Sequence, residues 1–493
     1  MRVVLISLDR ELYAVGVRLL SACLQEAGHE TRCIFMATEQ KERGQRGKPQ
    51  PRYSVELLDH LTELCADADL VGLSLMTHEF RDAVQVTEHL KNRGVQAPII
   101  WGGIHPTTMP DLSLQYADIV CVGEGEEALV ELVDRMARGL GYEDVANLAF
   151  ARGDGIVRNP VRPLVHDLDR LPLPDYGGHE HYVAREDHLE PLTAEGIRSF
   201  RGPRFRSRDG RIGYPLITSR GCLFACTYCC NDIYSQLYPN QHRLRWRSNE
   251  HVIREIEMIN ETVAPLFALY IVDDDFTARS YRDLEQFCET YKEKVGLPFS
   301  CQVSPITVSR KKLDALFDAG CLKITMGVET ASERVAGIYN RQRHHAHVKE
   351  AIELVESYRP RMARPPTYQF IIDNPYETFE ETLETLGLAL SLSRPWDNPI
   401  YSLMLFPGTS LYHAAKADGL LVDEYVQIYD RTWNQQSRPL FQFWIRLYRA
   451  NLFPNLLRIL LVPWIARLLT HPVVERLWRT PALRWLWQKK GIV

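Results

Sequence analysis

The sequence has no feature of an exported or membrane-spanning chain. Its 493 residues contain no charged start followed by an apolar run, so no secretion signal is expected, and no uninterrupted apolar run of about 18 residues predicts a membrane span. The cysteine pattern of a disulfide framework is also missing, because the eleven cysteines are an odd number and mostly scattered. We therefore expect a cytoplasmic protein with reduced thiols.

An excess of positive charge is missing as well. The net charge is −5, which argues against nucleic acid as a general partner, because the bulk composition does not supply the cations that neutralise phosphates. An apolar fraction of 45% and a charged fraction of 25% are those of an ordinary globular protein. The length predicts two or three domains rather than one core.

The densest chemical signal is the stretch SRGCLFACTYCCND. Cys222, Cys226 and Cys229 are spaced C-x3-C-x2-C within it. The loop follows a predicted strand, Pro215–Thr218, and is short enough to turn three sulfurs toward one point. Thiolates held this closely suit an iron–sulfur cluster with one open iron, or zinc. There are two alternatives: a zinc site completed by Cys230 or a distant histidine, and a set of buried thiols without a metal.

With Tyr228 directly before the last cysteine, the motif resembles the radical S-adenosylmethionine (radical SAM) signature. The resemblance implies that the three cysteines hold a [4Fe–4S] cluster and that S-adenosylmethionine (SAM) is cleaved there to a 5′-deoxyadenosyl radical. It also implies an electron donor such as flavodoxin or ferredoxin. By the same resemblance, Glu329, in the sequence GVET, is the best candidate for a SAM contact, and Ser304 is the next. Tyr228 is also predicted to bind the cofactor.

Strand–helix alternation surrounds this motif and predicts the open, six-stranded partial barrel of radical SAM enzymes. The predicted strands are Pro215–Thr218, Ala268–Val272, Phe299–Ser304, Lys323–Val328, Thr367–Ile372 and Ile400–Leu405. Polar residues gather at the predicted strand ends, which form the rim where barrel chemistry occurs. Asp273, Asp274 and Asp275 follow the second strand and predict either a polar rim with helix capping or a divalent-metal site.

Residues 1–140 show the same alternation, which predicts a doubly wound, Rossmann-like parallel sheet. The predicted strands are Val3–Ile6, Thr31–Met36, Asp69–Leu75, Ala97–Trp101 and Asp118–Val122. In such sheets, ligands bind at the carboxyl ends of the strands, near the point where strand order reverses. Small and turn-forming residues fall at three of those ends, in the sequences SLMT, GGIHP and GEGE.

Together with the radical SAM motif, these loops resemble the cobalamin-binding module of B12-dependent radical SAM enzymes. The resemblance implies that they line the corrinoid and its nucleotide tail. The residues carried over are Ser74, Met76, Thr77, Gly102, Gly103, His105, Pro106, Glu124 and Gly125. Taken alone, the Gly123-x-Gly125 pattern is more simply a strand-to-helix turn, and His105 is equally a turn histidine without a ligand.

The sequence departs from the enzymes that replace the lower axial base of cobalamin with a histidine. Those enzymes carry D-x-H-x-x-G after the first strand, whereas the corresponding place here, Asp9 to Ala14, contains no histidine. We therefore predict that the lower face of cobalamin meets a group other than histidine, for which Leu12 and Tyr13 are candidates. Cobalt without a basic lower ligand is poorer in electrons.

The C-terminal stretch differs in character from the rest of the chain. From Gln436 onward, ten Lys or Arg face one acid, which gives a net charge of +9, and five of the nine tryptophans lie there. Basic, Trp-rich amphipathic helices can lie on a membrane surface, and a helical cap over the barrel mouth is the alternative. Membrane contact would favour a lipid or another hydrophobic substrate.

The predicted domains are a cobalamin-binding domain at 1–140, a linker with one hairpin at 141–210, the radical SAM barrel at 211–432 and a helical, basic and aromatic region at 433–493. We interpret the chain as a cobalamin-dependent radical SAM enzyme that methylates an unreactive carbon of a small-molecule or lipid-like substrate. A non-methylating ring formation or rearrangement, with cobalamin as an electron or proton shuttle, is the second interpretation.

Two further alternatives carry less weight. Methylthio transfer would need a second cluster, but the four amino-terminal cysteines fall in predicted helices (Cys23, Cys65) and strands (Cys33, Cys121) rather than in loops. A corrinoid-binding sensor or carrier with a decayed barrel would not need to keep all three cluster cysteines and Glu329. The sequence does not identify the substrate.

Overall fold

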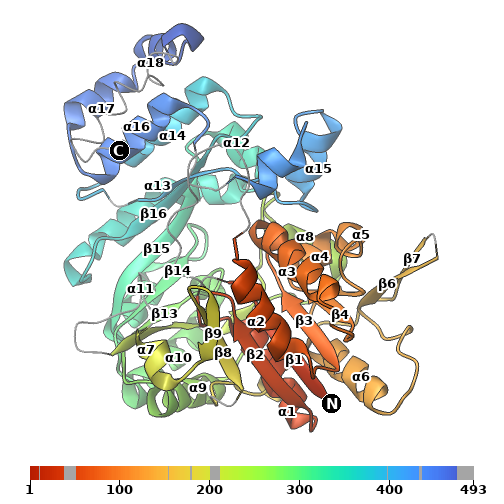
Figure 1. Cartoon of the computed structure of the whole chain (residues 1–493). Helices are drawn as coiled ribbons and strands as arrows, with labels where there is room; N and C mark the ends of the chain where they lie inside the picture. The colour runs from red at the N-terminus through yellow and green to blue at the C-terminus, as the bar shows by residue number, and fades with distance from the viewer. Residues whose placement is uncertain are drawn as a thin grey trace.

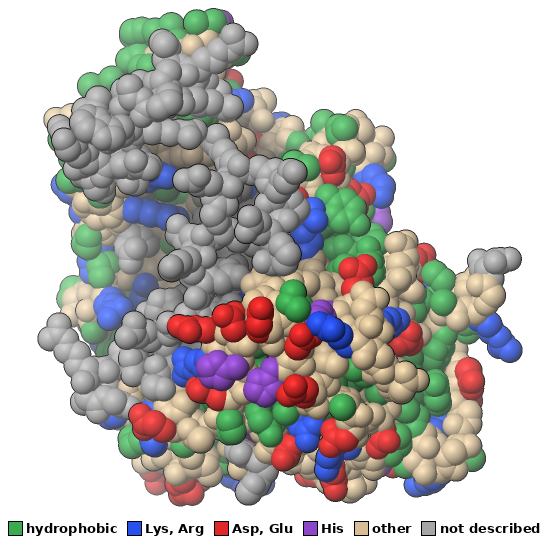
Figure 2. Space-filling view, in the orientation of Figure 1, with side chains coloured by type: hydrophobic (Ala, Val, Ile, Leu, Met, Phe, Trp, Pro, Cys, Tyr) green, Lys and Arg blue, Asp and Glu red, His purple; other side chains and the backbone are tan. Residues whose placement is uncertain are grey.

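The computed structural model describes residues 1–9, 11–37, 52–153, 155–177, 180–199, 211–396, 398–431 and 436–474. Within these residues, the chain forms a nine-stranded sheet, a six-stranded sheet and a two-stranded ribbon (Figure 1). Figure 2 shows acidic, basic and histidine side chains mixed over the lower half of one face.

The amino-terminal sheet has the order β7-β6-β5-β4-β3-β1-β2-β8-β9. Its strands are β1 (Arg2–Ser7), β2 (Glu30–Phe35), β3 (Leu70–Ser74), β4 (Ile99–Gly102), β5 (Ile119–Cys121), β6 (Leu148–Arg152), β7 (Gly155–Arg158), β8 (His181–Arg185) and β9 (His188–Pro191). Strands β2, β1, β3, β4 and β5 are parallel neighbours, so strand order reverses at β1. This confirms the predicted doubly wound sheet and its five strands.

Helices cover both faces of this sheet because its strands are apolar on both sides. The helices are α1 (Val15–Glu26), α2 (Val55–Cys65), η1 (Thr77–Glu79), α3 (Phe80–Asn92), α4 (Ile104–Thr108), α5 (Pro110–Ser113) and α6 (Glu126–Ala137). Val3 and Leu5 of β1 pack in a core with α1 and α6, whereas Val4 and Ile6 pack in a second core with α2 and α3. The alternation of side chains along the strand produces this division.

Strands from the predicted linker extend both edges of the sheet. β6 and β7 form the predicted hairpin and add to β5 in antiparallel pairing, although Asp154 of its turn lies outside the described residues. β8 and β9 form a second hairpin that pairs with β2, and the sequence analysis did not predict it. The predicted domain boundaries at 140 and 210 stay predictions.

The second sheet is parallel and keeps the order of the chain, β10-β13-β14-β15-β16-β17. Its strands are β10 (Ile212–Leu216), β13 (Leu266–Ile271), β14 (Phe299–Val303), β15 (Cys321–Glu329), β16 (Thr367–Ile372) and β17 (Ile400–Ser402). The connecting helices are α9 (Asn249–Thr262), α10 (Tyr281–Lys294), α11 (Arg310–Asp318), α12 (Glu333–Ile338), α13 (Gln342–Ser357) and α14 (Phe379–Ser391). The short elements are η3 (Phe276–Ala278), η4 (Arg359–Arg361), α15 (Ser410–Ala417) and η5 (Tyr425–Tyr429).

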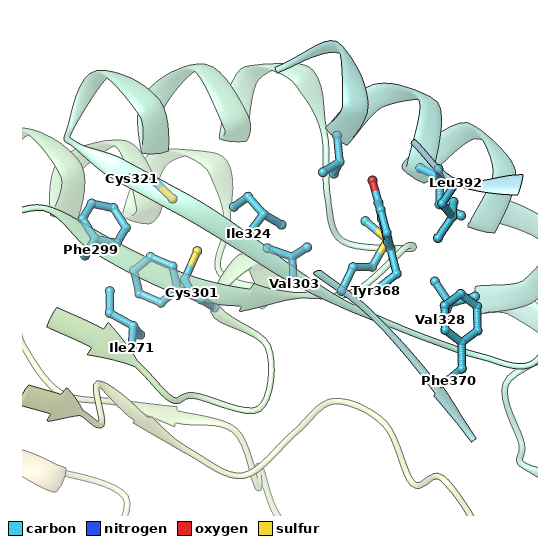
Figure 3. Close-up of a cluster of buried hydrophobic side chains, with 14 of the residues drawn as sticks. Ile271, Phe299, Cys301, Val303, Cys321, Ile324, Val328, Tyr368, Phe370 and Leu392 are labelled. Atoms are coloured by element: carbon cyan, nitrogen blue, oxygen red, sulfur yellow. The ribbon is translucent and has the colours of Figure 1, made fainter. Parts of the chain in front are cut away.

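This sheet curls into the predicted partial barrel, with helices packed on its outer side. Figure 3 shows part of the core between strands and helices, including Phe299 and Cys301 of β14 and Ile324 of β15. The carboxyl ends of the barrel strands and of the first sheet carry the polar loops that form the candidate site.

The chain after the barrel forms three described helices, α16 (Pro439–Arg449), α17 (Pro454–Leu460) and α18 (Pro463–Leu469), each with proline in its first turn. α16 buries its apolar side chains in the barrel core, and Tyr448 donates a hydrogen bond to the backbone oxygen of Ala389 in α14 at 3.1 Å. Among the described residues, no helix is long and apolar enough to cross a membrane. The predicted tail residues Trp478, Trp485 and Trp487 lie outside the described residues.

Candidate functional site

The three motif cysteines lie on one loop between β11 (Ser219–Arg220) and α8 (Cys230–Leu237). β11 pairs with β12 (Arg245–Trp246), which fixes the start of the loop. Gly221, directly before the first cysteine, has φ +81°, and a Cβ there would lie 2.3 Å from the backbone oxygen of Arg243. Only glycine fits this left-handed and tightly packed position, so the loop depends on it.

The environments of the three thiols differ. Cys226 is buried, whereas Cys222 and Cys229 are half-buried. Burial raises the pKa of Cys222 to about 12 and also raises that of Cys226. A hydrogen bond from Cys230 lowers the pKa of Cys229. Two of the three thiols therefore keep their protons at neutral pH until a soft metal displaces them.

Arg341 connects the cysteine loop to the predicted SAM contact. Its Nη1 donates to Sγ of Cys226 at 3.5 Å, and its Nη2 lies 3.9 Å from Oε1 of Glu329. Nη2 also donates to the backbone oxygen of Gly327 at 2.8 Å. Arg341 is buried and lies 115 residues after Cys226, so no local spacing in the sequence indicates it.

Arg341→Gln is expected to lower SAM cleavage by about 10- to 100-fold, because partners that orient a metal ligand contribute effects of this size. The measurement is 5′-deoxyadenosine formed by anaerobically reconstituted protein with a strong reductant, normalised to iron content. The matched control is Arg343→Gln, because Arg343 is the exposed neighbour two residues on. Cleavage equal to that of the control would contradict a role for Arg341 beside the thiolate.

The remaining predicted SAM contacts lie on the barrel rim and the cysteine loop. Glu329 ends β15 with φ 69°, and Asp373 follows β16 with φ 65°. Left-handed backbone is rare for residues other than glycine and often marks a functional site. Burial raises the pKa of the Glu329 carboxyl, although the positive charge of Arg341 opposes the change.

Ser304 makes a local contact, whereas Tyr228 packs against a distant part of the chain. The Ser304 hydroxyl accepts a hydrogen bond from the backbone N–H of Ile306 at 3.4 Å. The Tyr228 ring packs edge-on against Tyr339, with 4.8 Å between ring centroids. The structure places Tyr228, Glu329 and Cys226 beside Arg341, and the roles predicted for Tyr228, Ser304 and Glu329 stay predictions.

The three consecutive acids after β13 have separate structural partners. Asp273 accepts hydrogen bonds from the backbone N–H groups of Thr218 and Ser219 at 2.7 and 3.2 Å. Asp274 accepts one from Nδ2 of Asn231 at 2.9 Å. Asp275 caps the short helix η3. These contacts fit a polar rim with helix capping, which was the first of the two interpretations of the acids.

One cavity of about 430 Å³ lies where the carboxyl ends of the first sheet face the cysteine loop. Its apolar inner wall comes from the first sheet and its helices: Leu5, Val17, Leu20, Ile100 and Leu129. Its polar side comes largely from the cysteine loop and the strands next to it: Ser219, Arg220, Cys230, Asn231, Arg245, Asp273 and Asp274. An apolar pocket with a polar mouth is typical of a cofactor site.

Five of the predicted cobalamin contacts line this cavity: Ser74, Gly102, Gly103, Glu124 and Gly125. Gly103 has φ +102°, and a Cβ there would lie 2.7 Å from the backbone oxygen of Leu75, which explains why glycine occupies this place. Gly72 of β3, which the sequence analysis missed, leaves space in the wall, because a Cβ there would lie 3.0 Å from Leu5 Cδ2.

Four other predicted cobalamin contacts do not line the cavity: Met76, Thr77, His105 and Pro106. His105 is fully buried against Phe80, and burial lowers its pKa to about 4, so it is neutral at physiological pH. Neither of its ring nitrogens has a hydrogen-bond partner within the described residues. This environment fits the alternative of a packed turn histidine.

Leu12 and Tyr13, predicted to meet the lower face of cobalamin, also lie away from the cavity wall. Leu12 is buried in the core beneath α1, and the Tyr13 hydroxyl donates to the backbone oxygen of Gly213 in β10 at 2.6 Å. Tyr13 therefore connects the first domain to the barrel. The assignment of these two residues to the lower face stays a prediction.

Glu124 forms a buried ion-pair network with two arginines beside the cysteine loop. Arg245 donates to Oε1 and Oε2 of Glu124 at 2.7 and 2.9 Å, and Arg220 lies 3.2 Å from Oε1. The second guanidinium nitrogen of Arg220 lies 2.5 Å from Oε1 of Glu126. Because Arg220 precedes the cysteine loop, these pairs tie the GEGE turn of the first domain to that loop.

The cysteines considered for a second cluster lie in regular structure, as predicted: Cys23 in α1, Cys33 in β2, Cys65 in α2 and Cys121 in β5. Cys33 does lie near Asp175 and His181, with one ligand atom of each within 4.8 Å of the others. Asp175, however, already accepts hydrogen bonds from Ser21, Gln25 and His181. The group is therefore explained as a satisfied polar cluster.

Comparison with known families divides the chain as the two sheets do. Residues 1–133 match the B12 binding domain, and residues 216–389 match the Radical SAM superfamily. The chain is 25% identical over 397 residues to an uncharacterized methyltransferase of Pyrococcus horikoshii, which covers 78% of this chain and 79% of that protein. It is 29% identical over 349 residues to the anaerobic magnesium-protoporphyrin IX monomethyl ester cyclase of Cereibacter sphaeroides, covering 68% of this chain and 51% of the cyclase.

Solved structures share this two-domain fold. The radical S-adenosylmethionine methyltransferase TsrM from Kitasatospora setae superimposes with a TM-score of 0.65 at 17% sequence identity. The superposition covers 85% of this chain and 76% of TsrM. At this identity the likeness supports the architecture alone, which is a B12-binding sheet followed by a radical SAM barrel.

Proposed function

The chain belongs to the cobalamin-dependent radical SAM enzymes, whose cofactors are a [4Fe–4S] cluster, SAM and cobalamin, and we therefore propose that it methylates an unactivated carbon of a small molecule. One observation carries the proposal. A single cavity runs from the apolar wall at Gly72 and Ile100 to Cys230, the residue after the third motif cysteine. A cofactor held in this cavity would lie beside the cysteine loop.

The residues on the cavity fit the cofactor. The apolar wall formed by α1, α6 and the first sheet suits the flat aromatic base of the nucleotide tail of cobalamin, and Gly72 and Gly102 leave room for it. The polar side faces the cysteine loop. When bound, the cluster supplies one-electron chemistry and cobalamin carries the methyl group. The protein contributes orientation and the exclusion of water and oxygen.

Arg341 and Glu329 are proposed to orient SAM at the cluster. Arg341 donates to the sulfur of Cys226 and lies 3.9 Å from Glu329, so one guanidinium couples the cluster ligand to the carboxylate. A carboxylate at a strand end suits the amino group and ribose of SAM. Flavodoxin or ferredoxin is proposed as the electron donor, as in our sequence interpretation.

Similar proteins support methylation, and one of them supports the non-methylating reaction instead. The similar proteins include the methyltransferase of Pyrococcus horikoshii, which aligns over most of its length. The cyclase of Cereibacter sphaeroides favours a non-methylating reaction as the second candidate, but this chain spans about half of it. The two reactions consume SAM differently, because only methylation also turns SAM into S-adenosylhomocysteine.

The test measures both SAM products in anaerobically reconstituted protein that contains iron, sulfide and cobalamin, with a strong reductant. We expect S-adenosylhomocysteine together with 5′-deoxyadenosine. Gly72→Val should abolish cobalamin retention and S-adenosylhomocysteine, because its side chain would enter the cavity beside Leu5 and Ile100, while 5′-deoxyadenosine formation persists.

Gly387→Val in α14 is the matched control, because a Cβ there meets no atom within 4 Å. If the wild-type protein formed 5′-deoxyadenosine without S-adenosylhomocysteine, the non-methylating reaction would be favoured over methylation. Full cobalamin retention by Gly72→Val would contradict the assignment of the cavity. Zinc in place of iron would remove the radical SAM interpretation altogether.

A further inference from the structure

Large apolar side chains are exposed together on the helices after the barrel. Among the described residues, eighteen large hydrophobic side chains are exposed, and seven of them fall within the 22 residues from 452 to 473. They are Leu452, Phe453, Leu456, Ile459, Trp464, Leu468 and Val473, which we call the α17–α18 apolar surface. Figure 2 shows hydrophobic side chains gathered at the top of the view, where Figure 1 places α18.

The spacing of these residues follows from the way each helix is anchored. Leu457 and Leu460 bury one side of α17, so Leu456 and Ile459 face outward. Ala466 is the buried contact of α18, which leaves Trp464 and Leu468, four residues apart, on its outer side. Trp464 is 68% exposed and Leu468 is 58% exposed. Exposed apolar residues gathered in this way usually mark an interaction site.

The segment that carries this surface is basic, and the acid paired with it is Glu380 of α14, which binds Arg467. Residues 436–474 contain five arginines and no acid, and Arg446, Arg449, Arg458 and Arg467 are exposed. Residues 475–493, which follow directly in the sequence, add five Lys or Arg and three Trp with one acid. The remainder of the chain is net negative. A partner that takes up apolar side chains beside so many cations must itself be apolar and anionic.

We infer that the α17–α18 apolar surface binds the interface of an anionic lipid bilayer. Each helix has only seven residues, so the segment lies on the membrane rather than crossing it. Trp464 and Phe453 enter the headgroup region, where aromatic rings are favoured, and the arginines pair with lipid phosphates. A second copy of the chain fits less well, because it would bring a second cationic surface against the first.

This inference is independent of the proposed reaction, because none of the seven residues lines the cavity or contacts the cysteine loop. Its test is flotation of the full-length protein with vesicles of phosphatidylcholine alone and with vesicles that also contain phosphatidylglycerol. We expect the protein to float with the anionic vesicles and to stay in the soluble fraction with the neutral ones. High salt should weaken binding, because exposed charges are screened.

Trp464→Ser combined with Leu468→Ser is expected to lower the bound fraction at least about 10-fold, because two large apolar groups no longer leave water on binding. The matched control is Val422→Ser combined with Val426→Ser, because these valines are 89% and 61% exposed and lie outside the surface. That control should float like the wild-type protein. Far-ultraviolet circular dichroism checks that both double variants are folded.

Three outcomes would overturn the inference. One is a wild-type protein that stays soluble with anionic vesicles. Another is a Trp464→Ser, Leu468→Ser variant that floats as well as the control. The third is a protein that dimerises through this surface in sedimentation experiments and does not float, which would make a second copy the occupant.

Discussion

Replacing Cys226 by alanine is expected to remove the iron–sulfur cluster and all cleavage of SAM, whereas replacing Cys230 by alanine leaves both intact. The contrast arises because three sulfurs at C-x3-C-x2-C spacing hold a cluster with one open iron, and the fourth position belongs to SAM. Cys230 begins α8 and is exposed on the cavity wall. Because three cysteines and SAM fill the positions on the cluster, Cys230 is not required as a ligand.

The measurement is iron and sulfide content by chemical analysis after anaerobic reconstitution, together with 5′-deoxyadenosine formation. The wild-type protein and Cys230→Ala should each retain about four iron atoms per chain, as a [4Fe–4S] cluster requires. If Cys230→Ala lost its metal together with Cys226→Ala, a four-cysteine site would be favoured, and zinc would become the candidate metal.

The parts of the fold that the sequence predicted are those with local signals. Apolar runs of four to seven residues located all five parallel strands of the first sheet and five strands of the barrel, because buried parallel strands are apolar on both faces. The first barrel strand, predicted at Pro215–Thr218, lies earlier, at Ile212–Leu216, so the two ranges share only two residues. The hairpin at β8 and β9 was missed. Its strands carry histidine, arginine and glutamate, and they gain their place by pairing with β2 rather than from their own composition.

The candidate site divides in the same way. The cysteine loop and the glycines at the strand ends are indicated by short-range spacing, and Gly103 and Gly221 owe their identity to backbone packing. Arg341, by contrast, reaches Cys226 across 115 residues, and nothing near it in the sequence marks it. Contacts made by long flexible side chains between distant segments depend on the assembled fold, so a single sequence does not predict them.

The fold gives Glu124 other partners than the predicted cofactor. The sequence analysis assigned it to cobalamin, and it does line the cavity. Its carboxylate, however, is occupied by Arg245 and Arg220 and accepts the backbone N–H of Val165 at 3.3 Å. These contacts favour a positioning role, in which Glu124 holds the cysteine loop at a fixed distance from the first sheet.

Glu124→Gln is accordingly expected to lower the free energy of unfolding by about 3–5 kcal/mol, because it leaves the buried guanidinium of Arg245 without its counter-charge, whereas Arg220 keeps Glu126. The measurement is urea denaturation followed by circular dichroism at pH 7. Asp111→Asn is the control, since its partner is Arg158 in an ion pair that is more than half exposed, and its effect should stay within about 0.5 kcal/mol.

The pH dependence of stability offers a second check on the same network. Burial alone would raise the pKa of Glu124, but the hydrogen bond from Arg245 and the charge of Arg220 outweigh burial and hold it below its ordinary value of 4.5. A lowered pKa means that the stabilisation is fully present above pH 4.5 and is lost as pH falls through the folded-state pKa. The wild-type protein should therefore lose more stability than Glu124→Gln on acidification below pH 4.5. Equal losses would show that the carboxylate does not hold the two domains together, and the cysteine loop would then owe its position to Tyr13 and the other contacts between the domains.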